Sequence, residues 1–133
     1  MGVRAAVDCS DGFLADLGHV ASGSAVRVRV AVDALPLSPP LRRLAEGDRD
    51  RILAFAMTGG DDYELILAGD AALEPRLRAL AARCGCALTA VGEVLEPVGA
   101  PADALAAPAG LIQLSWHGEA LPLPPRLGYE HAV

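Results

Sequence analysis

Two aspartates and a serine fall within four positions, at Asp8, Ser10 and Asp11, directly before an amphipathic segment. A strand end followed by a polar turn and a helix N-terminus suits an anion, because unpaired backbone N–H groups and the helix dipole point toward the ligand. Two carboxylates would repel a bare phosphate, but a Mg²⁺ ion resolves this conflict, since Mg²⁺ is commonly held by one or two carboxylates together with phosphate oxygens. The stretch predicts a metal-bridged nucleotide site with Asp8 and Asp11 as Mg²⁺ ligands and Ser10 donating to phosphate.

The same three residues also allow a structural interpretation. Asp11 would satisfy the helix dipole, Ser10 would cap the helix and Asp8 would be a solvated strand end. The spacing alone leaves both interpretations open.

A second candidate stretch is "TGGDDYEL", residues 58 to 65. The glycine pair would let the backbone approach a ligand closely, and Asp61 and Asp62 could accept hydrogen bonds from an amine or hold a second metal. A Gly-Gly-Asp turn leading into a strand is also common without any function.

Hydrophobic periodicity predicts the elements that would position these residues. We expect strands over residues 3–7, 26–32, 63–68, 87–95 and 111–116. We expect helices over residues 13–21 and 71–83, and two helices within 41–57 divided near Gly47, with loops over 33–40 and 96–110. Alternating strands and helices, with one almost strictly alternating strand at 26–32, predict an α+β fold with α/β-type layers and a mixed sheet.

Composition narrows the classes of function. A chain of 133 residues with 53% apolar residues can bury a core as one domain. The net charge is −6 and no arginine cluster exceeds the pair Arg42-Arg43, so binding to nucleic acid or a membrane surface is disfavoured. The three cysteines form no disulfide framework, and Cys84-Gly85-Cys86 has no second pair to complete a metal site, so a cytoplasmic location fits best.

Several stretches together resemble the C-terminal domain of thiamine-monophosphate kinase, within the superfamily of aminoimidazole ribonucleotide synthetase. They are "DCSDGF" at 8–13, "DLGH" at 16–19, "ALPLS" at 34–38, "GGDDYEL" at 59–65, "VGEV" at 91–94 and "GYEH" at 128–131. The matches occur in the family's order from residue 8 to residue 131, which makes the set more specific than any single stretch.

The resemblance implies a Mg²⁺-dependent transfer of the γ-phosphoryl group of ATP to thiamine phosphate, giving thiamine diphosphate. It assigns Asp8 and Asp11 as Mg²⁺ ligands, Ser10 as an ATP contact, and Asp61 and Tyr129 as substrate contacts. Asp61 departs from the family's glutamate and is one methylene shorter. Glu130 and Ala132 replace the family's aspartate and phenylalanine in the closing segment.

The resemblance also implies that residues 1–133 form a single C-terminal kinase domain and that the family's N-terminal ATP-binding domain is absent. We therefore expect no phosphoryl transfer by the chain alone, and self-association through the apolar face that the absent domain would cover. Two other functions remain open: a non-catalytic binding or assembly module, and a domain of another superfamily member such as an aminoimidazole ribonucleotide synthetase-like ligase.

Overall fold

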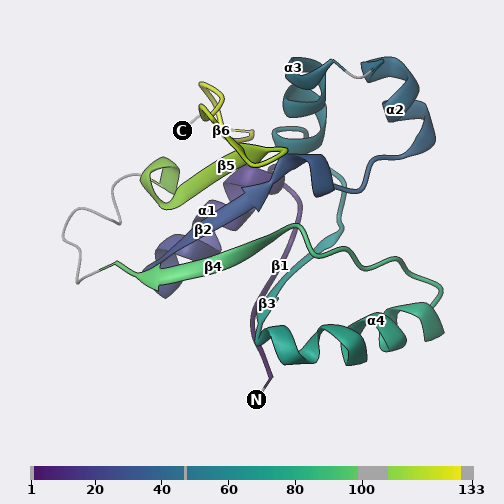
Figure 1. Cartoon of the computed structure of the whole chain (residues 1–133), viewed down its shortest axis with the longest axis vertical. Helices are drawn as coiled ribbons and strands as arrows, with labels where there is room; N and C mark the ends of the chain where they lie inside the picture. Colours follow the sequence, from purple (N-terminus) through teal and green to yellow (C-terminus); the bar gives the residue numbers. More distant parts are fainter. Residues whose placement is uncertain (1, 47, 99–107, 130–133) are drawn as a thin grey trace.

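The computed structural model describes residues 2–46, 48–98 and 108–129, which form two β-sheets and four α-helices (Figure 1). The larger sheet has the strand order β4-β2-β5-β6. In this sheet β2 (Val26–Ala31) is parallel to β5 (Ile112–Trp116), while β4 (Gly92–Pro97) and β6 (Glu119–Leu121) are antiparallel to their neighbours. The smaller sheet pairs β1 (Val3–Asp8) with β3 (Leu65–Gly69) in antiparallel orientation. The predicted α+β class with a mixed sheet is confirmed.

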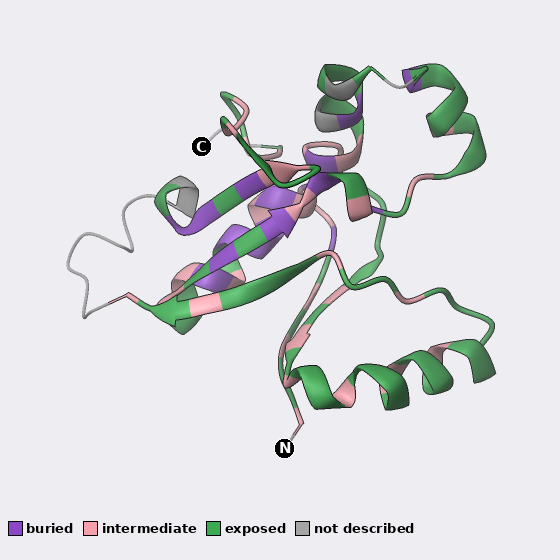
Figure 2. Ribbon diagram, viewed as in Figure 1, coloured by how far each residue is buried: buried purple, intermediate pink, exposed green. Residues whose placement is uncertain are grey.

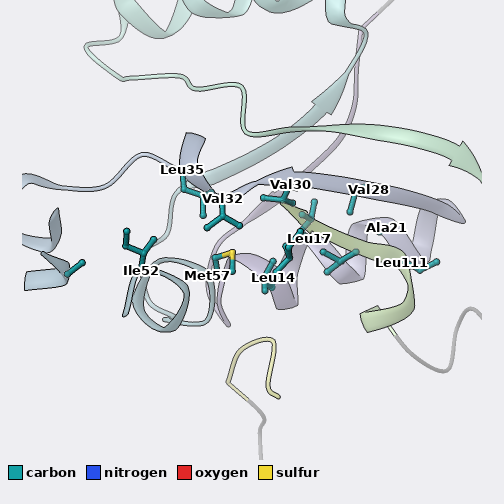
Figure 3. Close-up of a cluster of buried hydrophobic side chains, with 13 residues drawn as sticks. Leu14, Leu17, Ala21, Val28, Val30, Val32, Leu35, Ile52, Met57 and Leu111 are labelled. Atoms are coloured by element: carbon teal, nitrogen blue, oxygen red, sulfur yellow. The ribbon is translucent and has the colours of Figure 1, made fainter. Parts of the chain in front are cut away.

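Helix α1 (Phe13–Ser24) packs its apolar stripe against the larger sheet (Figure 3). Leu14 and Leu17 on the helix meet Val28 and Val30 on β2, and the buried cluster continues to Met57. The apolar residues at helical spacing on α1 and the alternate apolar residues of β2 thus pack together in one core. This packing fixes the N-terminal end of α1, which carries the candidate site.

The opposite face of β2 is exposed to solvent, as the alternation of apolar and polar residues in this strand predicts. Along β2 the exposed Arg27 and Arg29 alternate with the buried Val28 and Val30. The Arg29 guanidinium donates to the Glu93 carboxylate of β4 at 2.8 Å, across the antiparallel pair. The sheet is therefore covered by α1 on one face.

Several predicted boundaries were wrong. Ser38, expected in a loop, caps α2 (Pro39–Ala45) by accepting the Leu41 N–H, so the two prolines begin a helix. After α3 (Arg49–Ile52) the chain continues as a π-helical turn, Leu53–Met57. The strand expected over 87–95 is β4, which is shifted toward the C-terminus because its register follows its pairing with β2. Strand β6 was not predicted at all, and much of the expected 96–110 connection lies outside the described residues.

Helix α4 (Glu74–Arg83) stands apart from the core and has no buried residue (Figure 2). Gly85 follows the end of the helix with a φ of +71°, and the Cys86 N–H donates back to the Ala81 carbonyl oxygen. Exposed apolar side chains lie on α4, β3 and β4 in this part of the molecule: Leu65, Leu67, Leu80 and Val94. In the described part of the chain, no helix is long and apolar enough to cross a membrane.

Candidate functional site

The two acidic stretches lie side by side, because β1 and β3 deliver them from the same end of the smaller sheet. The pairing of Asp8 with Leu65 closes the ladder. Beyond it the loop continues to bond to the turn: the Tyr63 N–H donates to the Cys9 carbonyl oxygen at 2.8 Å, and the Asp61 N–H donates to the Ser10 carbonyl oxygen at 2.9 Å. The residues after one strand and before the other therefore form a single polar surface.

The C-terminal segment joins the same surface. The Tyr129 N–H donates to the Asp11 carbonyl oxygen at 2.7 Å. The Tyr129 side chain is exposed beside the turn. Three stretches that are remote in sequence thus meet through backbone hydrogen bonds.

Glycines allow this close approach. A Cβ on Gly60 would lie 2.5 Å from the Ser10 carbonyl oxygen, and a Cβ on Gly128 would overlap the Asp11 carbonyl oxygen. Gly12 has a φ of +121°, and a Cβ there would lie 3.0 Å from the Thr58 carbonyl oxygen. The backbones of the three stretches are therefore packed against one another where only glycine fits.

Asp16 in the first turn of α1 is the buried charged residue of this region, with a relative exposure of 4%. Its Oδ2 atom accepts the Ser10 N–H at 2.9 Å and the Asp11 N–H at 3.0 Å. These two backbone groups have an acceptor inside the protein, so they are not the phosphate donors that the turn suggested. The side chains of the turn that keep some exposure include the carboxylates of Asp8 and Asp11 and the hydroxyl of Ser10, a donor set that suits a cation better than a bare anion.

The expected cap of α1 was wrong. The N-cap is Gly12, no side chain makes a capping bond, and Ser10 lies two residues before it. The positive φ of Gly12 turns the chain into the helix, and Ser10 lies before this turn and is partly exposed.

Asp61 and Tyr63 have left-handed backbone conformations, with φ of 65° and 51°. Such conformations are uncommon for residues other than glycine and cluster at functional sites. Both residues are held by the backbone bonds to Ser10 and Cys9, and the Tyr63 hydroxyl donates to Asp61 Oδ1 at 3.2 Å. The Asp61 carboxylate is thereby oriented by its neighbour.

The pKa of Tyr63 gives a test of this pair. The hydrogen bond to Asp61 is the largest cause that raises the pKa of Tyr63, followed by the negative charge of Asp61. Because the folded pKa is raised above about 10, the contribution of this bond is complete below the unfolded pKa and is lost as the pH rises through the folded pKa. We expect the near-ultraviolet absorbance titration of Tyr63, identified by comparison with Tyr63→Phe, to shift to lower pH in Asp61→Asn. An unchanged titration in Asp61→Asn would show that the pair does not form.

The turn is rich in negative charge. Burial, together with the smaller effect of the negative charges of Asp62, Asp16 and Glu64, raises the pKa of the Cys9 thiol to about 11. Cys9 is therefore a neutral thiol that packs under the turn. In residues 2–46, 48–98 and 108–129, no three His, Cys, Asp or Glu side chains form a group that could hold a metal. The donors fit Mg²⁺ only as a partial set that phosphate oxygens and water would complete.

A mostly apolar hollow adjoins the surface at Thr58. Its lining combines the segment after α3 with the C-terminal stretch: Asp50, Ala54, Thr58, Pro122, Leu123, Pro124, Pro125 and Arg126. Apolar walls with a few polar groups are the usual lining of a site for a small organic molecule.

The structure brings the five predicted residues together: Asp8, Ser10, Asp11, Asp61 and Tyr129. Their roles stay predictions. Glu130 and Ala132 lie outside the described residues. The sequence analysis assigned no site role to Asp16. A signal was present, since Asp16 lies beside Leu17 on the apolar stripe of a helix. Charged residues are almost never fully buried unless they are paired, so an acid in that position indicates a bonded partner.

Comparison with known proteins finds curated relatives that share one name. The chain is 38% identical over 102 residues to the thiamine-monophosphate kinase of Caulobacter vibrioides, covering 74% of this chain and 29% of that protein. It is 48% identical over 61 residues to the enzyme of Salmonella typhimurium, covering 46% of this chain and 18% of that protein. No protein-family model matches the chain.

Two solved structures have the same fold. The thiamine-monophosphate kinase of Stenotrophomonas maltophilia K279a matches with a TM-score of 0.68 and 38% identity, over 90% of this chain and 33% of that one. AaThiL complexed with AMPPCP and TMP matches with a TM-score of 0.65 and 25% identity, over 98% of this chain and 34% of that one. This chain is therefore a relative of the thiamine-monophosphate kinases, and it spans about a third of their length.

Proposed function

We propose that this chain supplies one wall of a site where the γ-phosphoryl group of ATP is transferred to thiamine phosphate, giving thiamine diphosphate and ADP. The observation that carries the proposal is the meeting of residues 8–12, 58–63 and 128–129 on one acidic surface. The structural relative AaThiL was solved with AMPPCP and TMP, which supports the same pair of ligands here.

The residue roles follow from chemistry. Asp8 and Asp11 would hold Mg²⁺, and the Ser10 hydroxyl would donate to a phosphate oxygen of ATP. The ion would neutralise charge on the phosphate oxygens when bound. Asp61 and Tyr129 would contact thiamine phosphate, and the Tyr63 bond to Asp61 would orient that carboxylate despite its shorter side chain. Phosphoryl transfer depends mainly on positioning and charge neutralisation, which such a surface provides.

We further propose that residues 1–133 correspond to the C-terminal kinase domain and that catalysis also needs the remaining length of the relatives. The chain matches only about a third of the length of its relatives, which supports this proposal. The exposed apolar residues on α4, β3 and β4 are where such a partner, or a second copy of the chain, would be accommodated.

Calorimetric titration of the purified chain tests the proposal, with Mg-ATP and thiamine phosphate added separately. Heat with either ligand supports a preformed wall, and competition by other phosphorylated heterocycles measures its preference. No heat with either ligand would contradict binding by this chain and would favour an assembly module. Formation of thiamine diphosphate from both ligands would contradict the requirement for further residues.

A ligase of the aminoimidazole ribonucleotide synthetase type is the remaining alternative. The relatives described above are kinases at 38% and 48% identity, which favours the kinase. Tighter binding of another phosphorylated heterocycle than of thiamine phosphate would favour the ligase.

A further inference from the structure

Asp16 is not one of the five predicted site residues, but it makes hydrogen bonds to the backbone of two of them. It is buried, and one of its oxygen atoms accepts the N–H groups of two consecutive residues, Ser10 and Asp11. A buried carboxylate is costly unless it is hydrogen-bonded, and bonds to a charged acceptor are roughly twice as strong as neutral ones. The two bonds therefore fix the backbone of the turn firmly to α1.

The carbonyl groups of the same two residues are also engaged. The Ser10 carbonyl oxygen accepts the Asp61 N–H, and the Asp11 carbonyl oxygen accepts the Tyr129 N–H. With both the N–H and the carbonyl of each residue bonded, the backbone of Ser10 and Asp11 has one orientation. Their side chains consequently leave the backbone in fixed directions, although both are only partly buried.

Helix α1 gives Asp16 a rigid base. The Asp16 N–H donates to the Gly12 carbonyl oxygen at 3.0 Å, the first bond of the helix, and the neighbouring Leu14 and Leu17 are buried in the main core. The core, the helix and the turn are therefore connected through one side chain. Loss of that side chain would release the turn while leaving the core in place.

We propose that Asp16 is a positioning residue that holds Ser10 and Asp11 in the geometry needed for Mg²⁺ and nucleotide. This role rests on the proposed function. Replacement of groups that orient metal ligands typically weakens metal binding by about 10–100-fold. Asp16 touches neither the ion nor the substrate in this scheme, so its effect passes through the backbone of the turn.

Two variants of the whole chain test the role. Asp16→Ala removes both bonds, whereas Asp16→Asn keeps an oxygen that can accept them without the charge. Asp33→Asn is the matched control, because Asp33 accepts one backbone N–H, from His117, and its replacement changes the net charge equally. The probes are Mn²⁺ affinity, by electron paramagnetic resonance, and amide hydrogen exchange at Ser10 and Asp11, by nuclear magnetic resonance.

We expect Asp16→Ala to weaken Mn²⁺ binding by about 10–100-fold and to accelerate exchange of both amides, with Asp16→Asn intermediate and Asp33→Asn like the parent. Equal Mn²⁺ affinity in a folded Asp16→Ala would overturn the positioning role alone. A parent that binds no Mn²⁺ would overturn the proposed function and, with it, this role. If Asp16→Ala does not fold, amide hydrogen exchange in the parent chain is the test. Ser10 and Asp11 amides that exchange without protection in the parent would overturn the inference.

Discussion

Replacing Gly60 by alanine is expected to separate the two acidic stretches and to abolish binding of Mg-ATP. A Cβ at this position would lie 2.5 Å from the Ser10 carbonyl oxygen, and backbone cannot move aside as a flexible side chain could. The hydrogen bond from the Asp61 N–H to the same oxygen would break as the loop shifts. We expect the free energy of unfolding to fall by about 1–3 kcal/mol, as for other overpacked sites.

Gly23→Ala is the matched control for this experiment. Gly23 lies in α1 with nothing within 4 Å of an added Cβ, so the same change there should leave ligand binding intact. It should raise the free energy of unfolding by up to about 1 kcal/mol, since alanine is the better helix former. Chemical denaturation and Mg-ATP calorimetry on both variants measure the difference. Unaltered Mg-ATP binding in Gly60→Ala would show that the contact between the two stretches is not needed.

Replacing Asp8 and Asp11 together by asparagine should remove cation binding with little effect on the fold. Asp8 is exposed and Asp11 is partly buried, and the change preserves the backbone hydrogen bonds and the approximate size of both residues. Mg²⁺ prefers charged carboxylate ligands, so the loss of two should weaken Mn²⁺ and Mg-ATP binding by about 100-fold or more, beyond the 10–100-fold typical of groups that only orient ligands.

The control for this variant is the double replacement of Asp33 by asparagine and Glu93 by glutamine, which changes the net charge by the same amount. Glu93 makes an exposed ion pair with Arg29, and such pairs contribute little to stability. Far-ultraviolet circular dichroism verifies the fold of both proteins. Equal weakening in the control would mean that the overall charge, and not the turn, attracts the cation.

The layers of the fold were predictable, since each depends on a periodic pattern. The alternation over 26–32 gave β2, and the stripe that includes Leu14 and Leu17 gave α1. The start of β4 could not be predicted from the sequence, because Gly92 pairs with Val30 and only that tertiary contact sets the register of the strand. Likewise the cap of α1 was assigned to Ser10 by its residue type, whereas a positive φ at Gly12 decided it.

The residues of the candidate site could be predicted from the sequence, but their arrangement in space could not. Residue types and order were enough to select Asp8, Asp11 and Asp61. The left-handed backbone of Asp61 depends on its bond to Ser10, a contact between distant segments that no local pattern encodes. The bonds to Asp16 come from residues only five and six positions away, but they depend on the three-dimensional path of the turn and not on the residue types alone.

The bond between Asp11 and Tyr129 joins residues separated by almost the whole chain. Bringing such distant segments together has a loop-closure cost that is met only once other contacts hold the ends near each other. During synthesis, α1 and β2 emerge long before β5, the strand that lies beside β2 in the sheet. The surface around Asp11 is therefore among the last parts of residues 2–129 to become ordered, because it is complete only when the segment that contains Tyr129 has joined it.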